Sequence, residues 1–168
     1  MRLTSFLLTV CLSSVAVSHA LSLFGSDQQV LDDELAVPGD NPLFYCQSTD
    51  ENILLIDYVD LTPNPPEAGK TLTIKAHGNF TESVEEGAYM LLQVKYGLIT
   101  LIKQQADLCE QMSNVDEDCP LSGEKTITKD VDLPATVPPG KYTVTADVYT
   151  KDDQQIICLT ATVHFGGK

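Results

Sequence analysis

Residues 138–148 read PPGKYTVTADV, a turn sequence followed by a regular alternation of apolar and polar side chains. The apolar members at every second position are Tyr142, Val144, Ala146 and Val148. Successive side chains of a β-strand point to opposite faces of the sheet, so a period of two predicts a strand with one buried face. The Pro-Pro-Gly turn in front of it favours an antiparallel connection to the preceding strand.

The same alternation recurs along the rest of the chain. Strands are predicted over residues 53–61, 71–77, 88–96, 127–133, 142–148 and 157–165, and no segment has a convincing helical period. The pair Gly78-Asn79 is expected to break the second of these runs. Six or seven strands with a turn roughly every ten residues are typical of an immunoglobulin-like antiparallel β-sandwich of two sheets.

The start of the chain predicts the compartment. Arg2 precedes an apolar run over residues 6–12 and a small-x-small pattern that ends at Ala20, so residues 1–20 are predicted to be a signal peptide. Residues 21–37 hold few regularly spaced apolar side chains and are interpreted as a pro-segment or disordered arm, and residues 38–168 as the sandwich domain. We expect a protein of the secretory pathway that acts in a vacuole- or lysosome-like lumen or is secreted.

Four cysteines remain after Cys11 leaves with the signal peptide, namely Cys46, Cys109, Cys119 and Cys158. An even number in an oxidising compartment predicts two disulfides, and three pairings are open to four cysteines. The tripeptide that begins at Asn79 is a glycosylation acceptor pattern, and it predicts a glycan in a surface turn.

Charge and histidine content exclude several classes of function. The formal net charge is -14, so there is no basic surface to neutralise nucleic-acid phosphates. Only His77 and His164 remain after the signal peptide, and no Gly-x-Ser-x-Gly elbow or metal-spaced histidine pair accompanies them. The protein is therefore predicted not to be an enzyme and to hold no metal and no cofactor.

One stretch departs from the alternation, because residues 96–103 are apolar at both odd and even positions past Gly97. It is either a strand buried on both faces or a loop that covers the core, or else an apolar rim at the mouth of a cavity. The apolar connection over residues 133–138 is the candidate for a facing rim.

The order of the cysteines and turns carries a resemblance. Cys46 follows Tyr45, a proline-rich turn comes next, an apolar strand leads to Cys109, Cys119 precedes a proline, and Cys158 lies in the last strand. About residues 43–166 resemble the ML lipid-recognition domain family, in particular the fungal phosphatidylglycerol/phosphatidylinositol transfer proteins and the Niemann-Pick type C2 sterol carriers. The resemblance implies two sheets that stand apart to hold a lipid, with Cys46 bonded to Cys158 and Cys109 to Cys119.

The resemblance also implies a function: a soluble carrier, expected to be a monomer, that moves one sterol or phospholipid (phosphatidylinositol or phosphatidylglycerol) between membranes. A membrane sterol transporter is the expected receptor for the cargo. The alternative is a secreted protein-binding sandwich with a filled core. Lys95 and Lys103 are candidates for pairing with a lipid head group. The candidate lipid-binding residues are apolar side chains of the strands and rims: Met90, Leu92, Val94, Tyr96, Leu98, Ile99, Leu101, Ile102, Ile127, Val131, Leu133, Val137, Tyr142, Val144, Ala146, Val148 and Leu159.

Overall fold

The computed structural model describes residues 35–166, which form eight β-strands and one short helix. The elements are β1 (Leu43–Tyr45), β2 (Leu54–Thr62), β3 (Thr71–Val84), β4 (Tyr89–Tyr96), β5 (Ile99–Asp107), α1 (Leu108–Ser113), β6 (Leu121–Asp132), β7 (Gly140–Tyr149) and β8 (Gln155–Phe165). The predicted signal peptide and nearly all of the predicted arm lie outside the described residues. Within residues 35–166, no helix has the length and apolar character needed to cross a bilayer.

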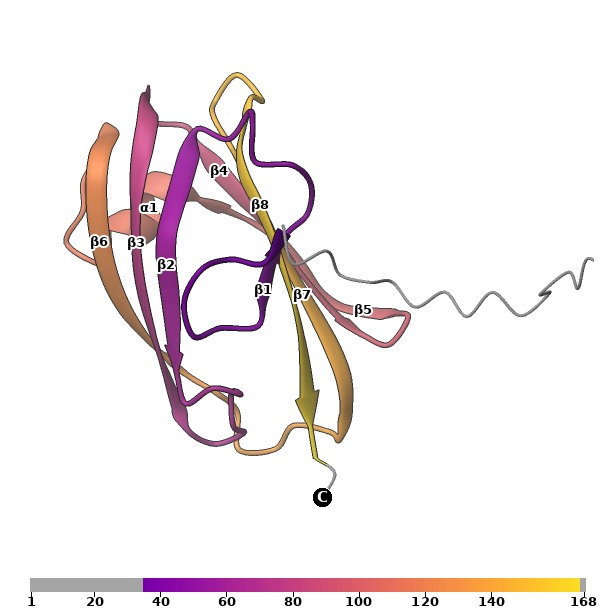
Figure 1. Cartoon of the computed structure of the whole chain (residues 1–168). Coiled ribbons are helices and arrows are strands. Elements are labelled where there is room, and N and C mark those ends of the chain that lie inside the picture. The colour runs from indigo at the N-terminus through magenta and orange to yellow at the C-terminus, as the bar shows by residue number, and fades with distance from the viewer. Residues whose placement is uncertain (1–34, 167–168) are drawn as a thin grey trace, which may run out of the picture. The chain divides into compact units, whose positions relative to one another are not determined.

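The strands form two antiparallel sheets that face each other (Figure 1). The larger sheet has the order β1-β8-β7-β4-β5, and the smaller sheet has the order β2-β3-β6. The chain passes from the larger to the smaller sheet through α1, which lies between β5 and β6 in the sequence. The prediction of an all-β, immunoglobulin-like sandwich of two sheets is confirmed.

Strand register explains why the apolar alternation marks the inner faces. Met90 of β4 pairs with Val148 of β7, and Leu92 pairs with Ala146. Because these four apolar side chains occupy alternate positions of neighbouring strands, they lie on one face of the larger sheet.

The least exposed core side chains meet at one end of the sandwich. Val84 at the end of β3 pairs with Leu121 at the start of β6, and both are fully buried. Ala88, just before β4, is also fully buried, and Ile156 at the start of β8 is 1% exposed. No polar or charged side chain among the described residues is buried. Apolar side chains therefore form the most tightly packed part of the core at this end.

The strand count and the absence of helix were predicted incorrectly. The structure adds β1 and β5 to the expected strands and places α1 inside the loop between Cys109 and Cys119. Asp107 caps α1, since its side-chain Oδ1 accepts a hydrogen bond of 2.9 Å from the Glu110 backbone N–H. A helix of six residues is too short to show a helical period in the sequence, so this cap was the available signal.

The prediction that Gly78-Asn79 interrupts the second strand is also wrong. β3 continues through both residues to Val84, and Gly78 pairs with Ile56 of β2. A Cβ atom at residue 78 would lie 2.6 Å from the carbonyl oxygen of Leu55, so the glycine permits a close approach of β2 to β3 and does not end the strand. Asn79 lies half-buried within β3 and not in a surface turn, and its glycan remains a prediction.

Two disulfides cross-link the chain, one over 112 positions and the other over 10. Cys46 is bonded to Cys158 and Cys109 to Cys119, the pairing that the family resemblance implies. The first bond ties the segment after β1 to β8, and the backbone N–H of Cys46 also donates to the Cys158 carbonyl at 3.1 Å. Packing begins before the expected domain start at residue 38, since Val37 is 4% exposed in the core.

Candidate functional site

An apolar cavity of about 260 Å³ lies between the two sheets. All but three of the residues that line it have apolar side chains. They are Leu43, Leu54, Ile56, Val59, Ile74, Ala76, His77, Gly78, Phe80, Met90, Leu108, Met112, Lys125, Ile127, Ala146, Val148, Ile156, Ile157 and Leu159. A wall of this composition offers dispersion contacts to a hydrocarbon and almost no polar partner.

A β-bulge sets which side chains of β2 reach this cavity. The pairing of β2 with β3 shifts between Ile56 and Tyr58, which leaves Asp57 as the extra residue. Before the bulge the even-numbered residues of β2 face the cavity, and after it the odd-numbered residues do. Ile56 and Val59 therefore line the cavity, and Tyr58 does not. Without the bulge, an unbroken alternation would aim Tyr58 inward.

Small residues at central positions leave the space unfilled. Ala76 and Gly78 of β3 line the cavity from the smaller sheet, and Ala146 of β7 lines it from the larger sheet. Met90 and Met112 also contact the space, and their flexible thioether side chains adapt to an irregular guest. The middle of the sandwich is therefore hollow at three positions where a larger residue would pack.

Five of the predicted lipid-binding residues line the cavity: Met90, Ile127, Ala146, Val148 and Leu159. The others do not. They are Leu92, Val94, Tyr96, Leu98, Ile99, Leu101, Ile102, Val131, Leu133, Val137, Tyr142 and Val144. Sequence reasoning missed the contribution of β2 and β3, because the alternation over residues 71–77 predicts a buried face but not a cavity, and the bulge at Asp57 reverses the alternation within β2.

The apolar stretch over residues 96–103 is neither a strand buried on both faces nor a loop that covers the core, and a rim at a cavity mouth stays a prediction. It forms the turn and first half of the β4–β5 hairpin, where β5 is an edge strand. Leu98 is fully exposed and Ile99 is 63% exposed, so the stretch is neither buried on both faces nor part of the cavity wall. On the facing connection, Leu133 and Val137 are half-buried and also stand outside that wall.

Lys125 is the one lysine among the residues that line the cavity. Its Nζ lies 2.6 Å from Glu117 Oε2, and the two side chains are 26% and 22% exposed. Lys125 pairs in register with Gly78, which has no side chain to compete for the space. The predicted head-group residues Lys95 and Lys103 lie elsewhere, since neither lines the cavity.

An aromatic cluster lies beside the turn of the β4–β5 hairpin. The rings of Tyr96 and Tyr142 lie 5.1 Å apart, and Phe165 packs edge-on against Tyr142 at 5.4 Å. Burial and then the neighbouring Tyr96 raise the pKa of Tyr142 above that of an ordinary tyrosine. Its hydroxyl therefore stays protonated and donates to the Pro138 carbonyl at 2.9 Å.

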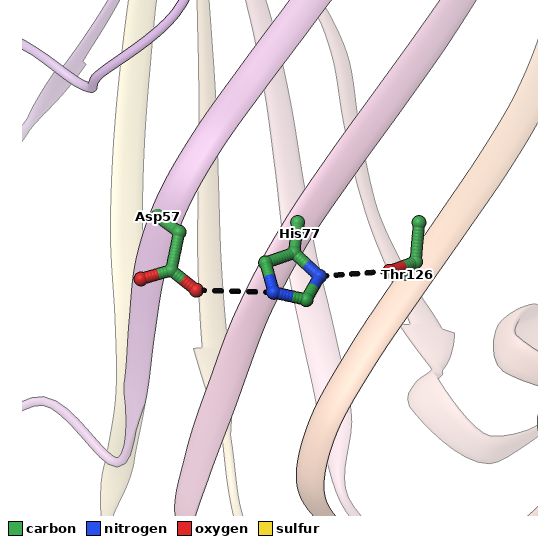
Figure 2. A network of polar contacts seen from close by, with 3 residues as sticks. All are labelled: Asp57, His77 and Thr126. Carbon is green, nitrogen blue, oxygen red and sulfur yellow. Dashed lines mark hydrogen bonds and ion pairs between the residues drawn. The ribbon is translucent and has the colours of Figure 1, made fainter.

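His77 takes part in a polar network across the smaller sheet (Figure 2). Its Nε2 lies 3.4 Å from Asp57 Oδ2, and its Nδ1 lies 2.7 Å from the Thr126 hydroxyl. The ring also stacks on Tyr58 at 5.7 Å, and Tyr58 is outside the cavity wall. The network thus links β2, β3 and β6 side by side, as a cross-strand tie.

A further group of potential ligand atoms lies at the longer disulfide. Asp147 stands within 4.8 Å of the sulfur atoms of Cys46 and Cys158. Both sulfurs are already bonded to each other, so they are not thiolates and this group is not a metal site.

These observations define an all-β sandwich that keeps an apolar cavity between its layers, in contrast to a sandwich with a filled core. Residues 40–165 match the profile described as the ML domain, and the chain belongs to this family. The two disulfides place its folding in the oxidising secretory pathway.

Two relatives share most of their length with this chain. A phosphatidylglycerol/phosphatidylinositol transfer protein of Aspergillus fumigatus is 58% identical over 161 residues, which cover 94% of this chain and 92% of that protein. A protein of the same name from Neurospora crassa is 51% identical over 172 residues, which cover 100% of this chain and 96% of that protein. Their names describe transfer of a lipid rather than a reaction, in agreement with the prediction that this chain is not an enzyme.

A solved structure shares the fold at low identity. The Niemann-Pick type C2 protein of the Japanese carpenter ant superposes with a TM-score of 0.52 at 10% identity, over 73% of this chain and 97% of that one. The likeness concerns the two-sheet architecture.

Proposed function

We propose that this protein carries one phospholipid at a time, of the phosphatidylglycerol or phosphatidylinositol kind, between membranes. The apolar cavity between the sheets carries this proposal, because its apolar walls can contact an acyl chain. The names of the relatives in Aspergillus fumigatus and Neurospora crassa support the lipid class. We further propose that it acts as a monomer in a vacuole-like lumen or outside the cell, and that a membrane receptor accepts the cargo.

Desolvation explains why a carrier is useful. Moving an acyl chain of about 16 carbons into water costs roughly 0.8 kcal/mol per methylene, or on the order of 13 kcal/mol. The cavity lowers this cost by replacing the lost bilayer contacts with aliphatic walls. Its volume of about 260 Å³ exceeds the ~150 Å³ that admits benzene in an engineered protein core and falls just short of the ~300 Å³ at which ligand pockets usually begin. Part of one acyl chain fits the present cavity, and a whole lipid requires the sheets to move apart.

Lys125 is the residue best placed to select an anionic head group. It lies at the cavity wall, and its Glu117 partner keeps the charge satisfied. A lipid phosphate that displaces Glu117 would form a comparable charge-assisted contact, so that the cation is paired with and without cargo. Neutral sterols have no anionic group, and the phosphate of phosphatidylcholine is balanced by the positive charge of its choline. We propose that this exchange favours phosphatidylglycerol and phosphatidylinositol.

The test of the carrier proposal is to fill the cavity. Ala146→Trp places an indole in the hollow beside Met90 and Leu159, and it is expected to lower the affinity for a fluorescent phospholipid at least about tenfold. Ala68→Trp adds the same side chain at an exposed position and should bind as the unchanged protein does. Native mass spectrometry reads the lipid adduct, and circular dichroism verifies the fold. Equal binding by both variants would exclude the cavity as the lipid site, and uptake of ergosterol alone would exclude the phospholipid assignment.

The head-group proposal is tested with two variants of the Lys125–Glu117 pair and a control. Lys125→Gln should reduce the preference for phosphatidylglycerol over phosphatidylcholine by about tenfold, as expected for losing one charge-assisted contact. Glu117→Gln frees Lys125 from its partner and should keep or raise that preference. Lys75→Gln, at an exposed position of β3, is the matched control. A competition experiment with the two lipids measures all three, and an unchanged preference in Lys125→Gln would remove this lysine from the site.

A further inference from the structure

The β4–β5 hairpin concentrates the exposed apolar side chains of the protein. Six large hydrophobic residues are exposed among residues 35–166, and four of them lie between positions 98 and 102. Leu98 is 100% exposed, Ile99 63%, Leu101 54% and Ile102 43%. We call residues 97–102 the hairpin tip. A cluster of this kind marks an interaction surface, whereas single exposed leucines are common on any protein.

The local geometry holds the hairpin tip away from the core. Tyr96 pairs with Ile99, so Gly97 and Leu98 form a two-residue turn, and Gly97 adopts the positive φ of 55° that such turns require of their first residue. A Cβ atom at Gly97 would meet nothing within 4 Å. In Figure 1 the end of the hairpin reaches beyond the other strands of its sheet, and all but one residue of β5 is exposed. The hydrophobic side chains are thus presented to an external partner.

The charge around the hairpin tip indicates what that partner is. Lys95 and Lys103 flank it on β4 and β5, and Lys141 of β7 lies beside it, since its carbonyl accepts a hydrogen bond of 3.1 Å from Gly97 N–H. We call these three residues the lysine group. No carboxylate occurs in residues 88–106 or 133–146, although the chain has 24 acidic residues against 10 basic ones. None of the three forms an ion pair with another residue of the described part of the chain.

We propose that the hairpin tip inserts into an anionic lipid bilayer while the lysine group contacts the lipid phosphates. This inference rests on the proposed carrier function, because a carrier must meet the membrane that it loads from. Apolar side chains beside lysines are the combination that binds a membrane interface, through burial of the former and attraction of the latter. The rest of this strongly acidic protein is repelled by the same surface, so it approaches with this end first.

Inner-face residues connect the hairpin tip with the cavity. From Met90, which lines the cavity, the alternate positions of β4 are Leu92, Val94 and Tyr96, and Tyr96 pairs with Ile99 at the tip. Met90, Leu92, Val94 and Tyr96 are all half-buried. An acyl chain that leaves the bilayer at the hairpin can therefore follow apolar side chains of a single strand into the space between the sheets. This assigns a role to those predicted lipid-binding residues of β4 and of the hairpin tip that do not line the cavity.

Vesicle flotation tests the proposal with the full secreted protein. Binding is measured to vesicles of phosphatidylcholine and to vesicles with equal parts of phosphatidylcholine and phosphatidylglycerol. Leu98→Asp is expected to lower the partition coefficient for the mixed vesicles about tenfold or more. Leu55→Asp makes the same change at a leucine that is 44% exposed on β2, and it should have no effect. Lys95→Gln combined with Lys103→Gln should reduce binding to mixed vesicles roughly fivefold for each lysine and leave binding to phosphatidylcholine unchanged.

A second measurement separates this inference from the carrier function. Uptake of a fluorescent short-chain phospholipid that is dispersed as monomers needs the cavity but no bilayer. Leu98→Asp should retain this uptake and lose vesicle binding, while Ala146→Trp should show the reverse. If the unchanged protein fails to float with mixed vesicles, or Leu98→Asp floats as well as Leu55→Asp does, the inference is wrong even if uptake persists. Dimers that disappear in Leu98→Asp, without vesicle binding, would instead make the hairpin a contact between two copies.

Discussion

Replacing Cys46 and Cys158 together with alanine is expected to lower the free energy of unfolding by about 4 to 5 kcal/mol. The bond closes a segment of 112 positions, so its loss releases a large part of the conformational freedom of the unfolded chain. It also holds β1, which has three residues and contacts only β8 within its sheet. A change of this size is comparable to the total stability of many small domains, so a fall in secretion should accompany it.

The matched comparison is the double alanine variant of Cys109 and Cys119. That bond closes a segment of 10 positions, for which the same argument gives about 2 to 3 kcal/mol. Urea unfolding of the two variants beside the unchanged protein measures the difference. Equal losses of stability would mean that the length of the closed segment does not govern the effect. An unaltered unfolding midpoint in the first variant would mean that the bond contributes nothing.

Gly39→Ala is expected to destabilise the protein by about 3 kcal/mol. Gly39 has a positive φ of 108°, and a Cβ atom there would collide with the Val59 carbonyl oxygen. The residues on either side hold the free edge of β2, because Val59 N–H donates to the Pro38 carbonyl at 2.8 Å and Leu61 N–H donates to the Asp40 carbonyl at 2.9 Å. The substitution therefore removes cover from an edge strand as well as straining the backbone.

Gly123→Ala is the control for backbone strain alone. Gly123 also has a positive φ, of 65°, yet a Cβ atom there meets nothing within 4 Å. This variant should lose only about 1 kcal/mol, the cost of placing an L-residue in the left-handed region. Thermal or urea unfolding measures the loss of stability in Gly39→Ala and in Gly123→Ala. A loss in Gly39→Ala no greater than that in Gly123→Ala would contradict the collision with β2.

The strands were predictable because their signal is local. Alternating apolar residues over 142–148 and 157–165 predicted β7 and β8, and the structure extends each by only one to two residues at an end. Gly78 misled the prediction, since a glycine in a strand can serve either as a terminator or as a point of close approach. The distinction depends on Leu55, which is distant in the sequence and adjacent in the sheet.

The candidate site was predictable only in part. Alternation placed Met90, Ala146 and Leu159 on inner faces, and these residues line the cavity. The same rule placed Val94 and Val144 on inner faces, but these two residues do not line the cavity. A period of two reports which side chains share a face, and it carries no information about what covers that face. The cavity walls from β2 and β3, and the position of Lys125, follow from the pairing of strands.

Local chemistry along the chain thus accounts for the all-β class, most strand positions and the oxidising compartment, because each depends on neighbouring residues or on composition. The hollow between the sheets and the exposure of residues 98–102 were settled by three-dimensional packing. A buried strand and an uncovered edge strand can have the same apolar sequence, since what separates them is whether another layer lies opposite. No layer lies opposite Leu98, which is fully exposed.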